Sequence, residues 1–175
     1  MRKFISIIGY AIGIVILAII HIGVIYLLPE PYVKLNIIFV FIVLILLIRE
    51  KGTVVWISFF LHLFLELYAT TPFGIILFSG TLSTLLTYWF YQSVFTNKSW
   101  FAAMAISIVA ISSYRIFYIT LLVLTQFVFN ITKVVFTPLL LTSLWELLFT
   151  TLLVGLIYLV LSKKLRKFDT KVIYS

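Results

Sequence analysis

Two side chains that can do chemistry, His62 and Glu66, lie four residues apart in an otherwise apolar stretch. The i, i+4 spacing puts both on one face of a helix, where they can form a hydrogen bond. The same spacing suits two metal ligands, but no third or fourth ligand follows in the sequence. The chain has no cysteine and only one other histidine, His21. We therefore expect a structural hydrogen bond here, and neither a metal site nor a cofactor.

Arg115 and Glu146 are the other charged residues that fall inside long apolar runs. At a rise of about 1.5 Å per residue, both lie near the middle of the helices that would contain them. A short connection makes those helices antiparallel neighbours, so the spacing predicts a buried ion pair between Arg115 and Glu146. The alternative is a proton or substrate relay, which would need more polar groups, and its candidates are Ser112, Ser113, Tyr114 and Tyr118.

No recognised catalytic motif is present. The sequence contains no Gly-x-Ser-x-Gly, no His-Glu-x-x-His and no Gly-rich phosphate loop. No nucleophile stands beside a base in an arrangement that suggests covalent catalysis. We expect a protein that is not an enzyme, and an intramembrane enzyme is the least favoured hypothesis.

The composition determines the class of protein that must position these residues. The chain of 175 residues is 64% hydrophobic and 10% charged, with a mean hydropathy of +1.27. Soluble domains contain about 25% charged residues, so we expect an integral membrane protein. Its apolar segments do not alternate with polar residues as barrel strands do, which predicts helices. The net charge of +8 then indicates orientation in the membrane, and no nucleic-acid partner is expected.

The apolar runs predict a bundle of six transmembrane helices forming one domain. A span needs roughly 17–25 apolar residues. The first run is longer than the ~7–15 apolar residues of a signal peptide, so we expect it to be retained. The expected spans are residues 4–28, 32–48, 53–68, 74–95, 100–129 and 137–161, followed by a basic tail at 162–175.

The basic residues predict that both termini are cytoplasmic. With the N-terminus inside, the outer loops contain Lys34 and Lys133. Membrane proteins place most basic loop residues on the cytoplasmic side. Ten basic residues then lie on the inner side: Arg2, Lys3, Arg49, Lys51, Lys98, Lys163, Lys164, Arg166, Lys167 and Lys171. We expect a multi-pass protein of the cytoplasmic membrane, in contact with the lipid bilayer.

Residues 64–74, Phe-Leu-Glu-Leu-Tyr-Ala-Thr-Thr-Pro-Phe-Gly, resemble the bacterial rod-shape-determining MreD family. In that family a span ends in an acid, usually Asp, and a short turn leads to a Gly that opens the next helix. Glu66 takes the acidic position and residues 72–74 supply the turn. Residues 95–99, Phe-Thr-Asn-Lys-Ser, resemble the family's polar basic turn. The chain departs from the family in having Glu for Asp and in lacking the Gly-rich approach to the acid.

The resemblance implies a non-enzymatic scaffold of the cell-wall elongation machinery. Such proteins bind the MreC membrane protein and help to connect the MreB filament to peptidoglycan synthases. It makes His62, Glu66, Pro72 and Gly74 the structural or docking candidates. It also implies a fold related to the S-components of vitamin transporters. The alternative function is therefore a substrate-binding transporter subunit, with a pocket partly lined by His62, Glu66, Thr70 and Thr71.

Overall fold

The computed structural model describes the backbone of residues 2–49, 52–94, 99–129 and 135–172, and most of their side chains, with those of 2–8, 10, 25, 49 and 163–172 excepted. The described backbone is helical, which confirms the all-helical class predicted from the sequence. It contains no strand. The elements are α1 (Arg2–Leu27), the 3₁₀ turn η1 (Tyr32–Lys34), α2 (Ile37–Arg49), α3 (Thr53–Glu66), α4 (Ile75–Val94), α5 (Trp100–Phe129) and α6 (Phe136–Val172).

Two of the described helices are long and apolar enough to cross a membrane: residues 100–129, which form α5, and residues 136–162 of α6. The apolar parts of α1, α2 and α3 are shorter. Helix α5 coincides with the predicted span. Helix α6 continues to Val172, through most of the predicted tail. Of the basic side chains that carried the orientation prediction, Lys34 is the one that the structure describes. The others lie outside the described side chains, and the other described basic side chain, Arg115, was not part of that prediction.

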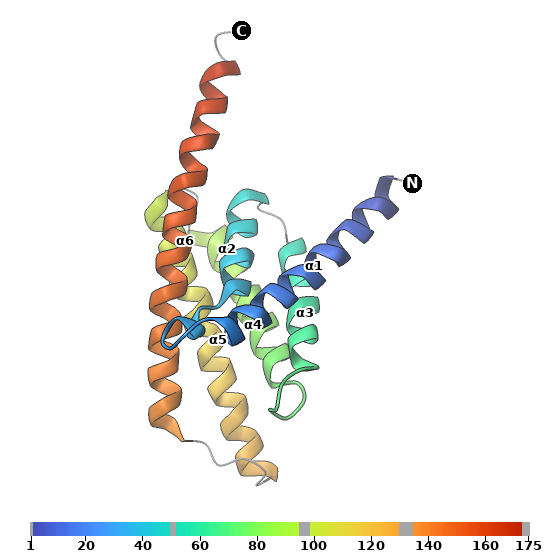
Figure 1. Cartoon of the computed structure of the whole chain (residues 1–175), viewed down its shortest axis with the longest axis vertical. Coiled ribbons are helices and arrows are strands. Elements are labelled where there is room, and N and C mark those ends of the chain that lie inside the picture. Colours follow the sequence, from blue (N-terminus) through green and yellow to red (C-terminus); the bar gives the residue numbers. More distant parts are fainter. Residues whose placement is uncertain (1, 50–51, 95–98, 130–134, 173–175) are drawn as a thin grey trace.

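Helix α2 is at the centre of the bundle and contacts α1, α3, α5 and α6. Its side chains Ile38, Phe39, Ile42, Val43 and Leu46 are fully buried. A helix that packs against several neighbours must be apolar on most of its surface, and α2 is apolar all round, with Phe41 40% exposed. Figure 1 shows α5 and α6 side by side, and α1 crossing the bundle obliquely, with its first half extending away from the other helices. The start of α1 and the end of α6 point toward the same end of the bundle.

The second and third helices are shorter than the spans predicted for them. In the predicted segment 32–48, the first residues form η1 and the α-helix begins only at Ile37. Helix α2 has 13 residues and α3 has 14. At about 1.5 Å per residue each extends roughly 20 Å, less than the ~30 Å hydrocarbon core. Neither is long enough to cross it upright without the flanking turns.

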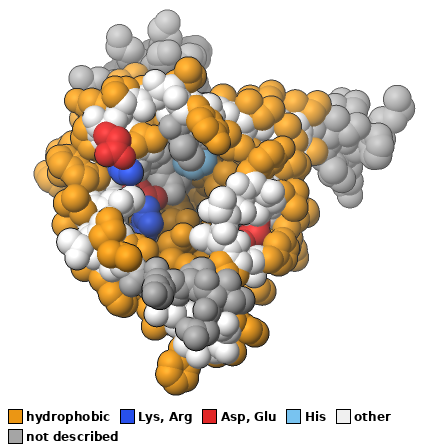
Figure 2. Space-filling view, turned by 60° about the horizontal axis from the view of Figure 1, so that its bottom comes forward, with side chains coloured by type: hydrophobic (Ala, Val, Ile, Leu, Met, Phe, Trp, Pro, Cys, Tyr) orange, Lys and Arg blue, Asp and Glu red, His pale blue; other side chains and the backbone are white. Residues whose placement is uncertain are grey.

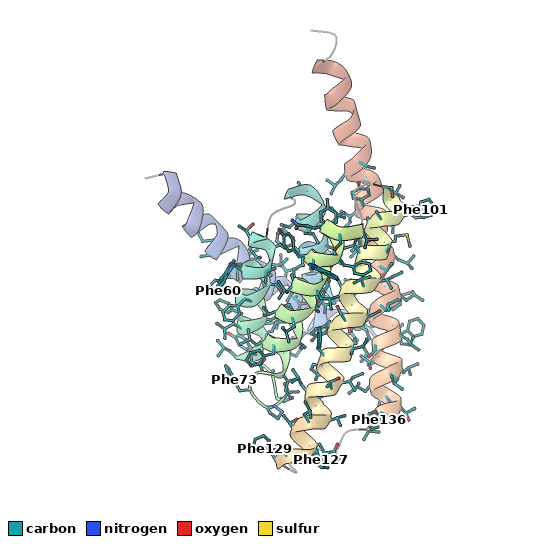
Figure 3. All side chains as sticks on the ribbon, turned by 180° about the vertical axis from the view of Figure 1, so that it is seen from behind. Phe60, Phe73, Phe101, Phe127, Phe129 and Phe136 are labelled. Carbon is teal, nitrogen blue, oxygen red and sulfur yellow. The ribbon has the colours of Figure 1, made fainter. Side chains whose placement is uncertain are left out.

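Many large apolar side chains lie on the outside of the bundle. Figure 3 shows large aromatic side chains at the periphery of α3, α5 and α6 and in the α3–α4 turn. Phe127 is 89% exposed and Phe101 is 74% exposed. Soluble monomers rarely expose large continuous apolar surfaces, so this exterior needs lipid or protein around it.

Candidate functional site

The structure brings Arg115 and Glu146 together inside the bundle. The Nε and Nη2 atoms of Arg115 both contact the same oxygen of Glu146, Oε2. The Glu146 side chain is 3% exposed and that of Arg115 is 18% exposed. The guanidinium carbon lies 5.7 Å from the ring centroids of Tyr114 and Tyr118. Aromatic faces at this distance stabilise a cation, so Arg115 is held by its acid and by two rings.

The other oxygen of Glu146 binds a residue that the sequence did not single out, Asn36. The amide of Asn36 donates to Oε1 of Glu146 at 2.6 Å, and its backbone N–H donates to the hydroxyl of Thr150 at 3.1 Å. The carbonyl oxygen of the Asn36 side chain accepts the backbone N–H of Phe39 at 3.2 Å. Asn36 is thus the N-cap of α2. Glu146 connects α2, α5 and α6 through one carboxylate.

A second polar network joins α3 to α4 around His62. The Nδ1 atom of His62 lies 2.8 Å from the carbonyl oxygen of Ser58, which can only accept, so Nδ1 carries the proton. The Ser58 hydroxyl lies 2.7 Å from that of Thr84 and 3.3 Å from the carbonyl oxygen of Gly80. A Cβ atom at Gly80 would lie 2.1 Å from Cδ2 of His62. The imidazole therefore occupies space that only a glycine leaves open.

Glu66 ends α3 and caps the start of α4. Its Oε2 atom accepts the backbone N–H of Leu77 at 2.6 Å. Helix α4 begins at Ile75, so this N–H is one of the first-turn donors that lack a partner within the helix. The positive end of the helix dipole also favours a carboxylate at this place. Glu66 is 4% exposed, so its carboxylate is buried at this junction of α3 and α4.

Pro72 and Gly74 form the turn that lets Glu66 reach α4. The carbonyl oxygen of Pro72 accepts the N–H of Ile75 at 3.4 Å. Gly74 has φ +101°, a conformation that disfavours side chains. A Cβ there would also lie 3.2 Å from the ring of Phe78. The turn positions predicted from the sequence thus hold the capping geometry.

His62 and Glu66 do not bond to one another, so the predicted hydrogen bond between them is wrong. The imidazole donates along its own helix to Ser58, and the carboxylate turns to α4. The first backbone N–H groups of α4 lack partners within their own helix, and Glu66 accepts one of them in place of the imidazole. No group of three or more His, Cys, Asp or Glu side chains with metal-site geometry occurs among the described residues.

The polar groups lie beside a hollow in the bundle. Figure 2 shows it on the face that carries the α3–α4 turn, with basic, acidic and histidine side chains in view inside it. A series of ring contacts lines the interior: Phe39 to His62 at 5.6 Å, His62 to Tyr114 at 6.0 Å, and Tyr114 to Tyr118 at 5.9 Å. The described interior therefore combines flat aromatic walls with a few fixed polar groups.

An apolar groove of about 440 Å³ lies between α1 and α3. A smaller groove of about 270 Å³ continues toward α2 and passes Gly9 and Gly13. A Cβ atom at either glycine would meet nothing within 4 Å, so this part of α1 is uncovered. The walls of the larger groove are Ala11, Ile14, Val15, Thr53, Trp56, Ile57, Phe60 and Phe64.

Several residues of these networks escaped the sequence analysis. Asn36, Ser58 and Thr84 are ordinary polar residues in apolar runs, and nothing in their spacing distinguishes them. Gly80 gave no signal because isolated glycines are common in membrane helices. Asn is a preferred N-cap residue. Asn36 could therefore have been recognised if a helix had been expected to begin directly after it, within the apolar run.

Comparisons with known proteins do not place this chain in a family. No protein-family model matches it, and neither curated proteins nor solved structures contain a match.

Proposed function

We propose that this chain is a six-span protein of the cytoplasmic membrane with both termini inside. In this proposal it acts as a non-enzymatic scaffold that docks the helices of partner membrane proteins. The observation that carries the proposal is the apolar groove between α1 and α3. An open lateral groove in a membrane bundle leaves side chains without packing partners. A transmembrane helix can supply that packing, and uncovered glycines permit close approach of its backbone.

The resemblance to the MreD family supports the choice of partner. In this proposal the groove receives the membrane helix of an MreC-like protein. Peptidoglycan synthases and the MreB filament would join through that complex. The Glu66 cap and the turn at Pro72–Gly74 support this role indirectly, because they fix α3, which forms one wall of the groove.

The test is co-purification with an MreC-like membrane protein. Ala11→Trp fills the groove with a large ring and should abolish recovery of the partner. Ile12→Trp is the matched control, because Ile12 is 55% exposed and does not line either part of the groove. Recovery that is equal in both variants and in the unaltered protein would refute docking in this groove.

A second candidate function is supported by the hollow on the turn-bearing face. In this role the chain is a subunit that binds a small molecule, of the S-component type. The supporting observation is the combination of aromatic rings and polar groups inside the bundle. Such mixed linings are typical of ligand pockets. Recovery of a vitamin or of an energising ATPase module with the purified protein would favour this function over docking.

A further inference from the structure

One wall of the apolar groove between α1 and α3 is a row of aromatic side chains on α3. Trp56, Phe60 and Phe64 are spaced four residues apart, all three line the groove, and they are 68%, 45% and 36% exposed. Figure 3 shows Phe60 projecting outward from α3. Residues at this spacing form a ridge along a helix, and the commonest helix packing fits such a ridge into the surface of a second helix. This wall therefore has the form that receives a helix.

The lining of this groove has no charged side chain. It consists of alanine, isoleucine, valine, tryptophan and phenylalanine, with Thr53 as its polar residue. A charged group placed against such a lining would be buried without a counter-charge, which is costly. The occupant is therefore apolar on the face that meets the groove.

The groove is shorter than the hydrocarbon core of a bilayer. Its lining on α3 runs from Thr53 to Phe64, which at about 1.5 Å per residue is roughly 17 Å. The whole of α3 has 14 residues, and the four residues before it in the sequence, 49–52, are Arg-Glu-Lys-Gly. An ordinary span has about 20 apolar residues and extends about 30 Å. A helix of that length would extend well beyond this wall.

Helices α5 and α6 present a much longer apolar surface. Helix α5 has 30 residues, and the apolar part of α6 has 27. Large rings are exposed at both ends of α5, Phe101 at 74% and Phe127 at 89%. Figure 3 shows that Phe127 lies beyond the level of Phe73 in the α3–α4 turn. The bundle is therefore uneven in apolar length, and the groove lies along its shorter part.

We propose that the helix that docks in the groove has a short apolar stretch, close to the 14 residues of α3, and not the ~20 of an ordinary span. A helix shorter than the hydrocarbon core thins the bilayer around it, and this mismatch drives some association between helices. Beside α3 a short helix meets a wall of its own length, whereas an ordinary helix has no mismatch to relieve there. This inference rests on the proposed docking function and specifies the partner by its length.

The test uses two synthetic helices of leucine and alanine with lysine at both ends. One has 14 apolar residues, as α3 has, and the other has about 20. The full-length protein is placed in nanodiscs of dioleoylphosphatidylcholine. Because the chain has no cysteine, Leu67→Cys gives a single site for a donor dye, and each peptide carries the acceptor. Leu67 is 66% exposed and does not line the groove. The readout is the affinity of each peptide, measured by energy transfer.

The short peptide should bind about tenfold more tightly than the long one, because it is about 9 Å shorter and mismatch has a cost for every ångström. In nanodiscs of dimyristoleoylphosphatidylcholine, whose bilayer is thinner, this preference should shrink, since the short helix is then less mismatched. Ala11→Trp should abolish binding of the short peptide. Ile12→Trp is the matched control and should leave binding unchanged, because Ile12 is exposed and lines neither groove.

Three results would overturn the proposal. Equal affinity of the two peptides, with both lost in Ala11→Trp, would reject selection by length while docking in the groove stands. A preference for the short peptide that survives Ala11→Trp would place the effect outside the groove. Binding of neither peptide would reject the proposal and leave the groove to lipid or to a second copy of the chain, and co-purification of a partner tests docking separately. The comparison of the two peptides holds even if Ala11→Trp does not fold.

Discussion

The polar interior and the lateral groove of this bundle differ in how completely their side chains are bonded and packed. In the interior, Asn36, Glu66 and Glu146 are buried, and each of them forms a side-chain hydrogen bond to another helix. In the groove, apolar side chains such as Trp56 and Phe60 are 68% and 45% exposed and pack on little. The first region fixes how the helices lie, and the second leaves a surface open.

The difference shows which contacts specify the fold of a bundle whose composition is apolar throughout. Lipid is as apolar as the side chains, so burial of apolar surface alone does not specify which helices meet. The polar contacts do this, because each buried group must find a particular partner. The groove is then free to vary or to receive another molecule without loss of the fold.

The largest expected effect comes from breaking the interior ion pair. Arg115→Met leaves the carboxylate of Glu146 buried without its cation, which typically costs about 3–5 kcal/mol. The measurement is unfolding in mixed micelles of increasing SDS content, followed by circular dichroism. Lys34→Met, at the exposed pair with Glu30, should change the free energy of unfolding by less than about 1 kcal/mol.

A double variant sharpens this test. In Arg115→Met with Glu146→Gln, the second change removes the stranded charge while an amide oxygen remains for Asn36. The double variant should recover much of the lost stability. If it is no more stable than Arg115→Met, the loss does not arise from an uncompensated charge.

The next effect compares two glycines, one in each region. Gly80→Ala forces a methyl group against the ring of His62, and overpacking of this kind costs about 1–3 kcal/mol. Gly13→Ala meets nothing within 4 Å and should not destabilise the protein, because alanine favours a helix by up to about 1 kcal/mol over glycine. The same unfolding measurement applies. Equal effects at the two positions would contradict the packing described for His62. As a control, adding His62→Ala to Gly80→Ala should reduce the loss of stability that Gly80→Ala causes.

A smaller effect is expected at the cap of α4. Glu66→Ala removes the acceptor of the Leu77 N–H, and loss of a capping side chain costs about 0.5–2 kcal/mol. Glu66→Gln should lose less, because it keeps an acceptor. Hydrogen exchange of peptides from the start of α4 should be faster in the Ala variant than in the Gln variant. Equal exchange in both would mean that the side chain does not cap this helix.

The smallest effect is expected in the groove. Phe60→Ala removes a half-exposed ring, and substitutions at such positions usually change stability by no more than about 0.5 kcal/mol. SDS unfolding is again the measurement. A loss as large as that of Gly80→Ala would show that the groove is part of the structural core, and the contrast between the two regions would fail.

The sequence by itself determined the helical class and much of the layout. Uninterrupted apolar runs admit helices only, and the run at 100–129 predicts the bounds of α5. Charged residues within such runs must be paired, and the antiparallel order of two neighbouring runs was enough to bring Arg115 and Glu146 together. The Pro-Phe-Gly sequence was enough to predict the turn after Glu66.

Only the tertiary structure decided which polar atoms meet. His62 and Glu66 share a helix face, yet the hydrogen bonds of Glu66 depend on where the first turn of α4 lies in space. Asn36 became important because α2 begins inside the bundle, where the first N–H groups of a helix need partners. The groove arises because half of α1 diverges from the bundle (Figure 1). Sequence periodicity reports burial along one helix, whereas these features depend on distances between helices.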